Sequence, residues 1–282
     1  MGLPSHVHLS QGSLQDYVDC PRRFHLRYVK RLQWPAVETE PALKNEAHLR
    51  QGAALHRMIR QHLMGIPAAT LSSTVDDPEL RQWWQNYLKE GPAGLPDERY
   101  PEVMLSAVVG ESRLVARYDL IAIGDDGRAV IVDWKTNRKR PRRAWLSARL
   151  QTRVYPYVLV RAGSVLGNRR APQPDDVTMI YWFANFPSAP ETYRYDARQY
   201  RADERYLLDL VDEIGKAIAS CPKDQLLPRT DDDRHCEVCR YRSLCRRGVE
   251  PGWLDDPERE MTLDDSFGDT LDFEQIAELD MG

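Results

Sequence analysis

Two aspartates and one lysine in the middle of the chain have the types and spacing to hold a metal ion and a charged substrate. Asp119 lies in the β-rich run 114–123, and Asp133 and Lys135 close a second run beyond the turn 124–127. Two such runs around a short turn predict a hairpin. Because side chains alternate along a strand, Asp133 and Lys135 point to the same side. Carboxylates in such an arrangement are typical ligands of a divalent cation.

Three cysteines near the C-terminal end form a second group with ligand spacing. The order Cys236-x2-Cys239-x5-Cys245 brings three thiols close together. No basic segment followed by an apolar one opens the chain, so we expect a cytoplasmic protein, in which disulfides are rare. Thiolates suit zinc or an iron–sulfur cluster, and the spacing alone does not separate these two alternatives. The candidates for a fourth ligand are Cys20, His235 and Cys221.

The formal net charge of −4 hides a basic body and an acidic tail. Residues 250–282 carry twelve Asp or Glu and one Arg, a local charge of −11, and removing that from the total leaves +7 on residues 1–249. A basic body is compatible with a phosphate-backbone ligand, and equally with an ordinary solvated surface. No apolar run approaches the roughly 20 residues of a membrane span, and we expect no membrane association.

Helices must position these groups around the hairpin. Hydrophobic periodicity predicts one helix over 10–28, interrupted at Cys20. It predicts further helices over 45–64, 78–89, 144–162 and 201–220. A strand over 102–109 precedes the hairpin, so three antiparallel strands are expected, and 177–183 is a further strand.

Two pairs of polar side chains on these helices have helical spacing. His56 shares a helix face with Arg60, and Gln151 shares one with Tyr155. A single helical histidine is more often a surface residue or a satisfied core residue than a ligand. For Gln151 and Tyr155, the alternative to a functional pair is a polar stripe on a core helix.

The assembled motifs resemble the PD-(D/E)XK nuclease superfamily, and within it the RecB-like branch with an iron–sulfur cluster, which includes CRISPR-associated exonucleases. The resemblance covers nearly all of residues 8–248. It rests on motifs in a fixed order: Cys20-Pro-Arg-Arg-Phe24, Gly52-x3-His56, Asp119, Asp133-Trp134-Lys135, Gln151-x3-Tyr155 and the triple-cysteine segment. Tyr118 replaces the proline that names the superfamily, and Ala116 stands where Gly is frequent.

The resemblance implies an α/β (α+β) fold with a restriction-endonuclease-like core. A central mixed β-sheet would be flanked by helices, with an iron–sulfur cluster module built from the N- and C-terminal parts. The nuclease domain would span 1–249, followed by an acidic, disordered tail over 250–282. The implied ligands of a [4Fe–4S] cluster are Cys20, Cys236, Cys239 and Cys245.

The resemblance also implies roles in metal-dependent hydrolysis of phosphodiester bonds. Lys135 would orient or help deprotonate the attacking water, and Gln151 and Tyr155 would contact the nucleic acid or position Lys135. Glu102 is a candidate outer carboxylate. The implied ligands of Mg2+ or Mn2+ are His56, Asp119, Asp133 and the backbone carbonyl of Trp134.

The expected activity is that of an exonuclease on single-stranded DNA ends, in repair, recombination or CRISPR spacer acquisition. Helicases or CRISPR adaptation proteins are the expected partners. One alternative is a catalytically silent nucleic-acid-binding or scaffold protein of the same fold, and another is a zinc-stabilised nuclease. The acidic tail could aid solubility, bind a partner or cover the basic surface as a mimic of DNA.

Overall fold

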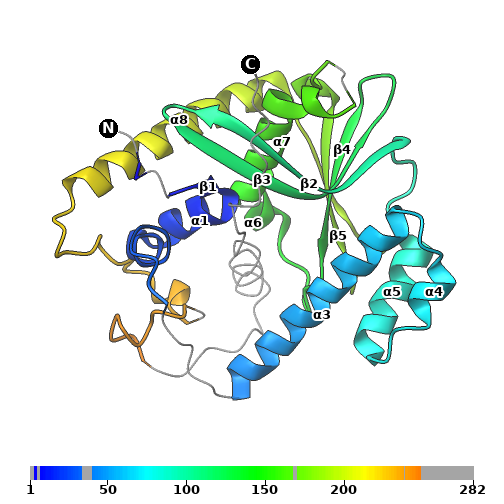
Figure 1. The fold of residues 1–282 in the computed structure, drawn as a ribbon, viewed down its shortest axis with the longest axis horizontal. Coiled ribbons are helices and arrows are strands. Elements are labelled where there is room, and N and C mark those ends of the chain that lie inside the picture. The colour runs from blue at the N-terminus through cyan, green and yellow to red at the C-terminus, as the bar shows by residue number, and fades with distance from the viewer. Residues whose placement is uncertain (1–2, 5–6, 34–39, 168–169, 238, 249–282) are drawn as a thin grey trace.

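A mixed six-stranded sheet forms the centre of the computed structural model, which describes residues 3–4, 7–33, 40–167, 170–237 and 239–248 (Figure 1). The strands are β1 (Leu9–Ser10), β2 (Glu98–Val109), β3 (Ser112–Ile123), β4 (Ala129–Lys135), β5 (Val177–Phe183) and β6 (Glu191–Arg194). β2 pairs antiparallel with one edge of β3. The other edge of β3 is shared between β1, which is parallel to it, and β4, which is antiparallel. β4 and β5 are parallel, whereas β5 and β6 are antiparallel, so the predicted mixed sheet is confirmed.

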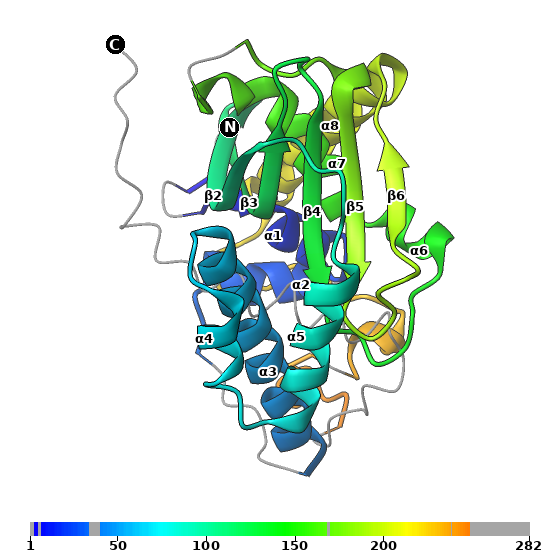
Figure 2. The ribbon, with the colours of Figure 1, turned by 90° about the vertical axis from the view of Figure 1, so that its right-hand side faces the viewer.

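Helices cover both faces of this sheet (Figure 2). One face packs against α1 (Gln11–Asp19), α7 (Leu150–Ala162) and α8 (Ala197–Ser220). The other carries α3 (Glu40–Leu63), α4 (Ala68–Ser72) and α5 (Pro78–Glu90), whose core contains four tryptophans, Trp83, Trp84, Trp134 and Trp182. Because both faces are covered, every residue of β4 is buried. The short helices are α2 (Pro21–Phe24) and α6 (Arg143–Ala148).

The alternation of side chains along β3 shifts by one residue near Asp119. Tyr118 faces the core under α7, but so does Ile121, three residues later, which regular alternation does not allow. The neighbouring strand β2 is distorted at the same level, because Glu102 adopts a φ of 54°, in the left-handed region that non-glycine residues rarely occupy. This paired distortion redirects Glu102 and Asp119 relative to the rest of their strands.

The single helix predicted over 144–162 is wrong, because the chain forms two helices separated at Arg149. Arg149 has an extended ψ of 141°, and α7 begins at the next residue. The N–H of Leu150 donates to Oε1 of Gln15 in α1 over 3.1 Å. A partner that is distant in sequence therefore defines where the helix starts.

The two ends of the described chain lie side by side (Figure 1). The N–H of Arg22 donates to the Pro228 carbonyl over 3.0 Å. The Tyr241 hydroxyl donates to the Leu32 carbonyl over 2.9 Å. The acidic tail and its predicted disorder lie outside the described residues. Within those residues, none of the helices combines the length and the apolar character needed to cross a bilayer.

Tyr118, which stands in place of the superfamily proline, ties β3 to α7. It is fully buried, and its hydroxyl donates to the Tyr155 carbonyl over 2.8 Å. We expect Tyr118→Phe to lower the free energy of unfolding by roughly 1 kcal/mol, the usual net value of such a bond. Urea unfolding of the full chain measures this. The control Tyr206→Phe, at a partly exposed position of α8, should change stability by less than about 0.5 kcal/mol; equal losses in both would contradict the role of the hydroxyl.

Candidate active site

Asp119 is held at the point where β3 and β4 separate. The regular pairing of these strands ends at Leu120 and Val132. Beyond it, the N–H of Trp134 donates to Asp119 Oδ2 over 2.8 Å instead of to the backbone of β3. Asp119 Oδ1 lies 3.2 Å from His56 Nδ1. The carboxylate is therefore positioned by a strand on one side and by a helix on the other.

His56 reaches Asp119 because α3 approaches the end of β4 closely. Gly52 precedes His56 by one helical turn, so the two residues lie on the same face of the helix. A Cβ added at Gly52 would lie 3.0 Å from Thr136 Oγ1. The missing side chain therefore allows the close approach that seats His56.

Glu102 joins His56 and Asp119 in one cluster. The ligand atoms of the three residues all lie within 4.8 Å of one another, the one such group among the residues that the structure describes. Arg117 holds the Glu102 carboxylate through Nε at 3.0 Å and Nη2 at 2.6 Å, both to Oε2. Two carboxylates and an imidazole are a suitable donor set for Mg2+ or Mn2+. Glu102, predicted as an outer carboxylate, thus lies among the candidate ligands.

Asp133 and Lys135 form a buried ion pair beside this cluster. The two residues are 3% and 4% exposed, and Lys135 Nζ lies 2.9 Å from Asp133 Oδ2. Gln151 from α7 donates to the other oxygen, Asp133 Oδ1, over 2.6 Å. The Lys135 ammonium also lies 5.9 Å from the centroid of the Tyr181 ring. The contact between Lys135 and Asp133 agrees with the prediction that both side chains point to the same side of their strand.

The two aspartates have different proton affinities. Burial raises the pKa of Asp133 to about 7, although Lys135 acts in the opposite direction. Burial also opposes ionisation of Asp119, but His56, the Trp134 N–H and Lys135 outweigh it and lower the Asp119 pKa. A divalent cation bound at this site would favour the ionised form of Asp133, so the electrostatics of the site fit the donor set.

The side chains of Gln151 and Tyr155 contact different parts of the site. Gln151 contacts Asp133, and its own Oε1 is buried without a hydrogen-bond partner among the described residues. The Tyr155 ring packs against Tyr118 at a centroid distance of 4.8 Å, and its interaction with Arg117 links it to the Glu102 side of the cluster. Gln151 is therefore aimed at the ion pair, whereas Tyr155 supports the strand that carries Asp119.

Cys20 and the three cysteines of the C-terminal motif line one small cavity, together with Arg23 and His235. All five cysteines are free thiols, and the fifth, Cys221, is not among the lining residues. Burial and the neighbouring thiols raise the pKa of Cys236 to about 11. A cationic metal centre would convert such thiols to thiolates, so the donor set fits a soft metal or a cluster. The lining cysteines are Cys20, Cys236, Cys239 and Cys245.

A sequence model of the PD-(D/E)XK nuclease superfamily matches residues 8–246. The chain belongs to this superfamily. No curated protein matches the sequence at a significant level. Among solved structures, SSO0001 aligns at 15% identity with a TM-score of 0.42, over 86% of this chain and 87% of its own. A protein named "Putative exonuclease" from Eubacterium rectale aligns at 10% identity with a TM-score of 0.44, over 83% and 93%.

Two residues that position the site were missed in the sequence. Arg117 lies two residues before Asp119 on the same strand, a spacing that could have marked it as a neighbour on the same side. Its partnership with Glu102 depends on the backbone distortion, which no local pattern reveals. Gln15, which holds the start of α7, gives no signal in the sequence beyond its place on an amphipathic helix.

The close approach at Gly52 can be tested through metal affinity. We expect Gly52→Val to push α3 away from Thr136 and to weaken Mn2+ binding by about tenfold, as changes that disturb ligand orientation do. Calorimetric titration with Mn2+ measures this. Ala53→Val, at an exposed position of the same helix, is the matched control and should bind as the wild type does. Similar weakening in both variants would show that a β-branched residue anywhere on α3 weakens Mn2+ binding, and that the contact between Gly52 and Thr136 is not the cause.

Proposed function

We propose that this nuclease is a Mg2+- or Mn2+-dependent deoxyribonuclease that acts as an exonuclease on single-stranded DNA ends. The observation that carries the proposal is the cluster of His56, Glu102 and Asp119 within 4.8 Å, beside the buried pair of Asp133 and Lys135. The catalytically silent alternative is disfavoured because it would retain two buried charges that stability alone does not require.

Each side chain of the site has a distinct task in this proposal. A bound divalent cation would polarise the phosphate and lower the pKa of an attacking water. Asp119, His56 and Glu102, with Asp133 beside them, would hold the cation, and the carbonyl of Trp134 remains a predicted further ligand. Lys135 orients the water or stabilises charge that develops on the phosphate. Gln151 fixes the rotation of the Asp133 carboxylate through its 2.6 Å hydrogen bond.

The cysteine cavity is proposed to hold a [4Fe–4S] cluster that fastens the N-terminal helices to the C-terminal segment. Four cysteine ligands suit a single zinc ion as well as a [4Fe–4S] cluster, so metal analysis has to separate the two. With this cluster, the protein would resemble the RecB-like branch and would act in the cytoplasm, in repair, recombination or CRISPR spacer acquisition, with a helicase or adaptation proteins as partners.

The first experiment tests the reaction. End-labelled single-stranded DNA should be degraded in the presence of Mg2+ or Mn2+, and a circular single strand, which has no ends, should resist. Asp133→Ala and Lys135→Ala should each lower the rate at least about a hundredfold, since both remove groups that act on the reacting atoms.

The matched control for the ion pair is Lys89→Ala. Lys89 forms an exposed pair with Glu90 on α5, with a side chain 80% exposed, so its removal should leave the rate unchanged. Degradation that survives Asp133→Ala and Lys135→Ala would refute the assigned site. Cleavage of the circular strand would show an endonuclease instead.

The second experiment tests the cluster. We expect Cys245→Ala to give colourless or insoluble protein, because a ligand of the cavity is lost. Cys221→Ala, the control outside the cavity, should remain brown and soluble. Visible absorbance with iron, sulfide and zinc analysis distinguishes the outcomes. Stoichiometric zinc without iron would replace the cluster with a structural zinc site.

A further inference from the structure

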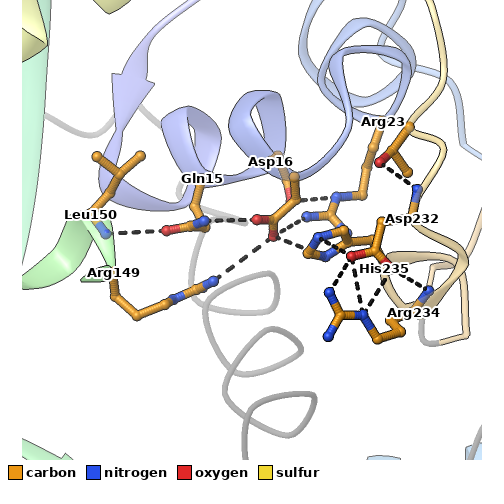
Figure 3. Close-up of polar contacts among 10 residues, drawn as sticks. Gln15, Asp16, Arg23, Arg149, Leu150, Asp232, Arg234 and His235 are labelled. Carbon is orange, nitrogen blue, oxygen red and sulfur yellow. Dashed lines mark hydrogen bonds and ion pairs between the residues drawn. The ribbon is translucent and has the colours of Figure 1, made fainter. Parts of the chain in front are cut away.

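The first amide of α7 is bound by a side chain from α1 (Figure 3). The first N–H groups of any helix lack a carbonyl partner within that helix and need an acceptor from outside. Gln15 provides one, because its Oε1 accepts from the Leu150 N–H over 3.1 Å at a buried position. Arg149, which precedes the helix, makes no side-chain capping bond. The start of α7 therefore depends on Gln15.

The amide of Gln15 is held at its other end by Asp19. Gln15 Nε2 donates to Asp19 Oδ1 over 2.8 Å. Asp19 Oδ2 lies 2.8 Å from Arg23 and 3.8 Å from both Arg149 and His235. A glutamine amide has one donating and one accepting end, so these bonds leave one orientation for the side chain.

The outer end of this network reaches the cysteine cavity. Arg23 and His235 line the cavity, and Asp19 immediately precedes Cys20 in the chain. Arg23 is buried and also pairs with Asp16 at 2.7 Å, which fixes it relative to α1. Movement of the cavity wall therefore reaches Asp19 both through the backbone and through an ion pair.

The inner end of the network reaches the active site. Gln151 follows Leu150 directly, and its Nε2 lies 2.6 Å from Asp133 Oδ1. Because the two residues are adjacent, a displacement of the Leu150 backbone displaces Gln151. Misplacement of a catalytic group by about 1 Å can slow a reaction about a hundredfold.

We propose that Gln15 is a positioning residue that couples the cysteine cavity to the active site by holding the start of α7, and with it Gln151, in place. A filled cavity fixes Cys20 and Asp19, and thereby the Gln15 amide. An emptied cavity releases this restraint, and the start of α7 loosens. The activity test of this inference rests on the proposed function, whereas its structural test does not.

The activity test uses Gln15→Met, which keeps the length of the side chain and removes both hydrogen bonds. Its kcat on single-stranded DNA should fall about tenfold to a hundredfold while KM changes less than about threefold, because no substrate contact is lost. Gln11→Met on the same helix is the control and should behave as the wild type. In a Gln151→Ala background, Gln15→Met should cause no further loss. Equal effects of the two Met variants, or multiplying losses in the double variant, would overturn the proposal.

The structural test uses hydrogen exchange of the amides of residues 150–155 in the full chain. Emptying the wild-type cavity with a chelator of iron and zinc, checked by absorbance and metal analysis, should speed this exchange about tenfold, as for one lost hydrogen bond. Gln15→Met should exchange fast before chelation and gain nothing from it. An equal response to chelation in the wild type and in Gln15→Met would exclude the coupling.

Asp19→Ala separates the two arms if Gln15→Met does not fold. It leaves Gln15 Oε1 free to accept from the Leu150 N–H but removes the acceptor of Gln15 Nε2, so exchange should stay slow and become insensitive to chelation. Continued sensitivity would contradict the coupling through Asp19. An inactive wild type that shows this exchange pattern would refute the proposed function and leave the coupling intact. An active nuclease without the pattern would refute the coupling and leave the proposed function intact.

Discussion

The hydrogen bond from the Trp134 amide to Asp119 is the interaction on which the arrangement of the active site depends. One edge of β3 is paired with β1 at 114–115 and with β4 at 120–123, which leaves the segment between them open. A buried amide needs an acceptor, and the Asp119 side chain supplies it where the strand backbone no longer can. The same contact that ends the pairing of the strands therefore fixes the first carboxylate.

The remaining charges of the site are costly to bury. Asp133 and Lys135 lie at the end of a strand that is covered on both faces of the sheet. Removing one partner of such a pair typically costs about 3 to 5 kcal/mol, while replacing both with apolar residues is often neutral. Stability therefore does not explain the pair. Its position beside Asp119 is the arrangement that the proposed metal-dependent hydrolysis requires.

Local patterns were sufficient to predict much of the fold. The hairpin, the antiparallel order of β2, β3 and β4, and the strand β5 follow from alternation and turn residues, and the structure has all of them. The helix predicted over 144–162 failed because its break depends on Gln15, 135 residues earlier in the chain. Glu102 was underestimated because its place depends on a left-handed backbone conformation. Cys20 was joined to the other cysteines through resemblance, since no local pattern connects residues so far apart.

The distance along the chain between the walls of the cysteine cavity has a consequence during protein synthesis. Cys20 is made 225 residues before Cys245. At roughly 5 to 20 residues per second, about ten to forty-five seconds separate them on the ribosome. During that time the Cys20 thiol lacks the other three cysteines that line the cavity. A chain truncated before Cys236 never contains them, so its cavity stays incomplete. The cavity can therefore be complete only in a chain whose translation has passed Cys245, close to the end of the region that matches the nuclease superfamily.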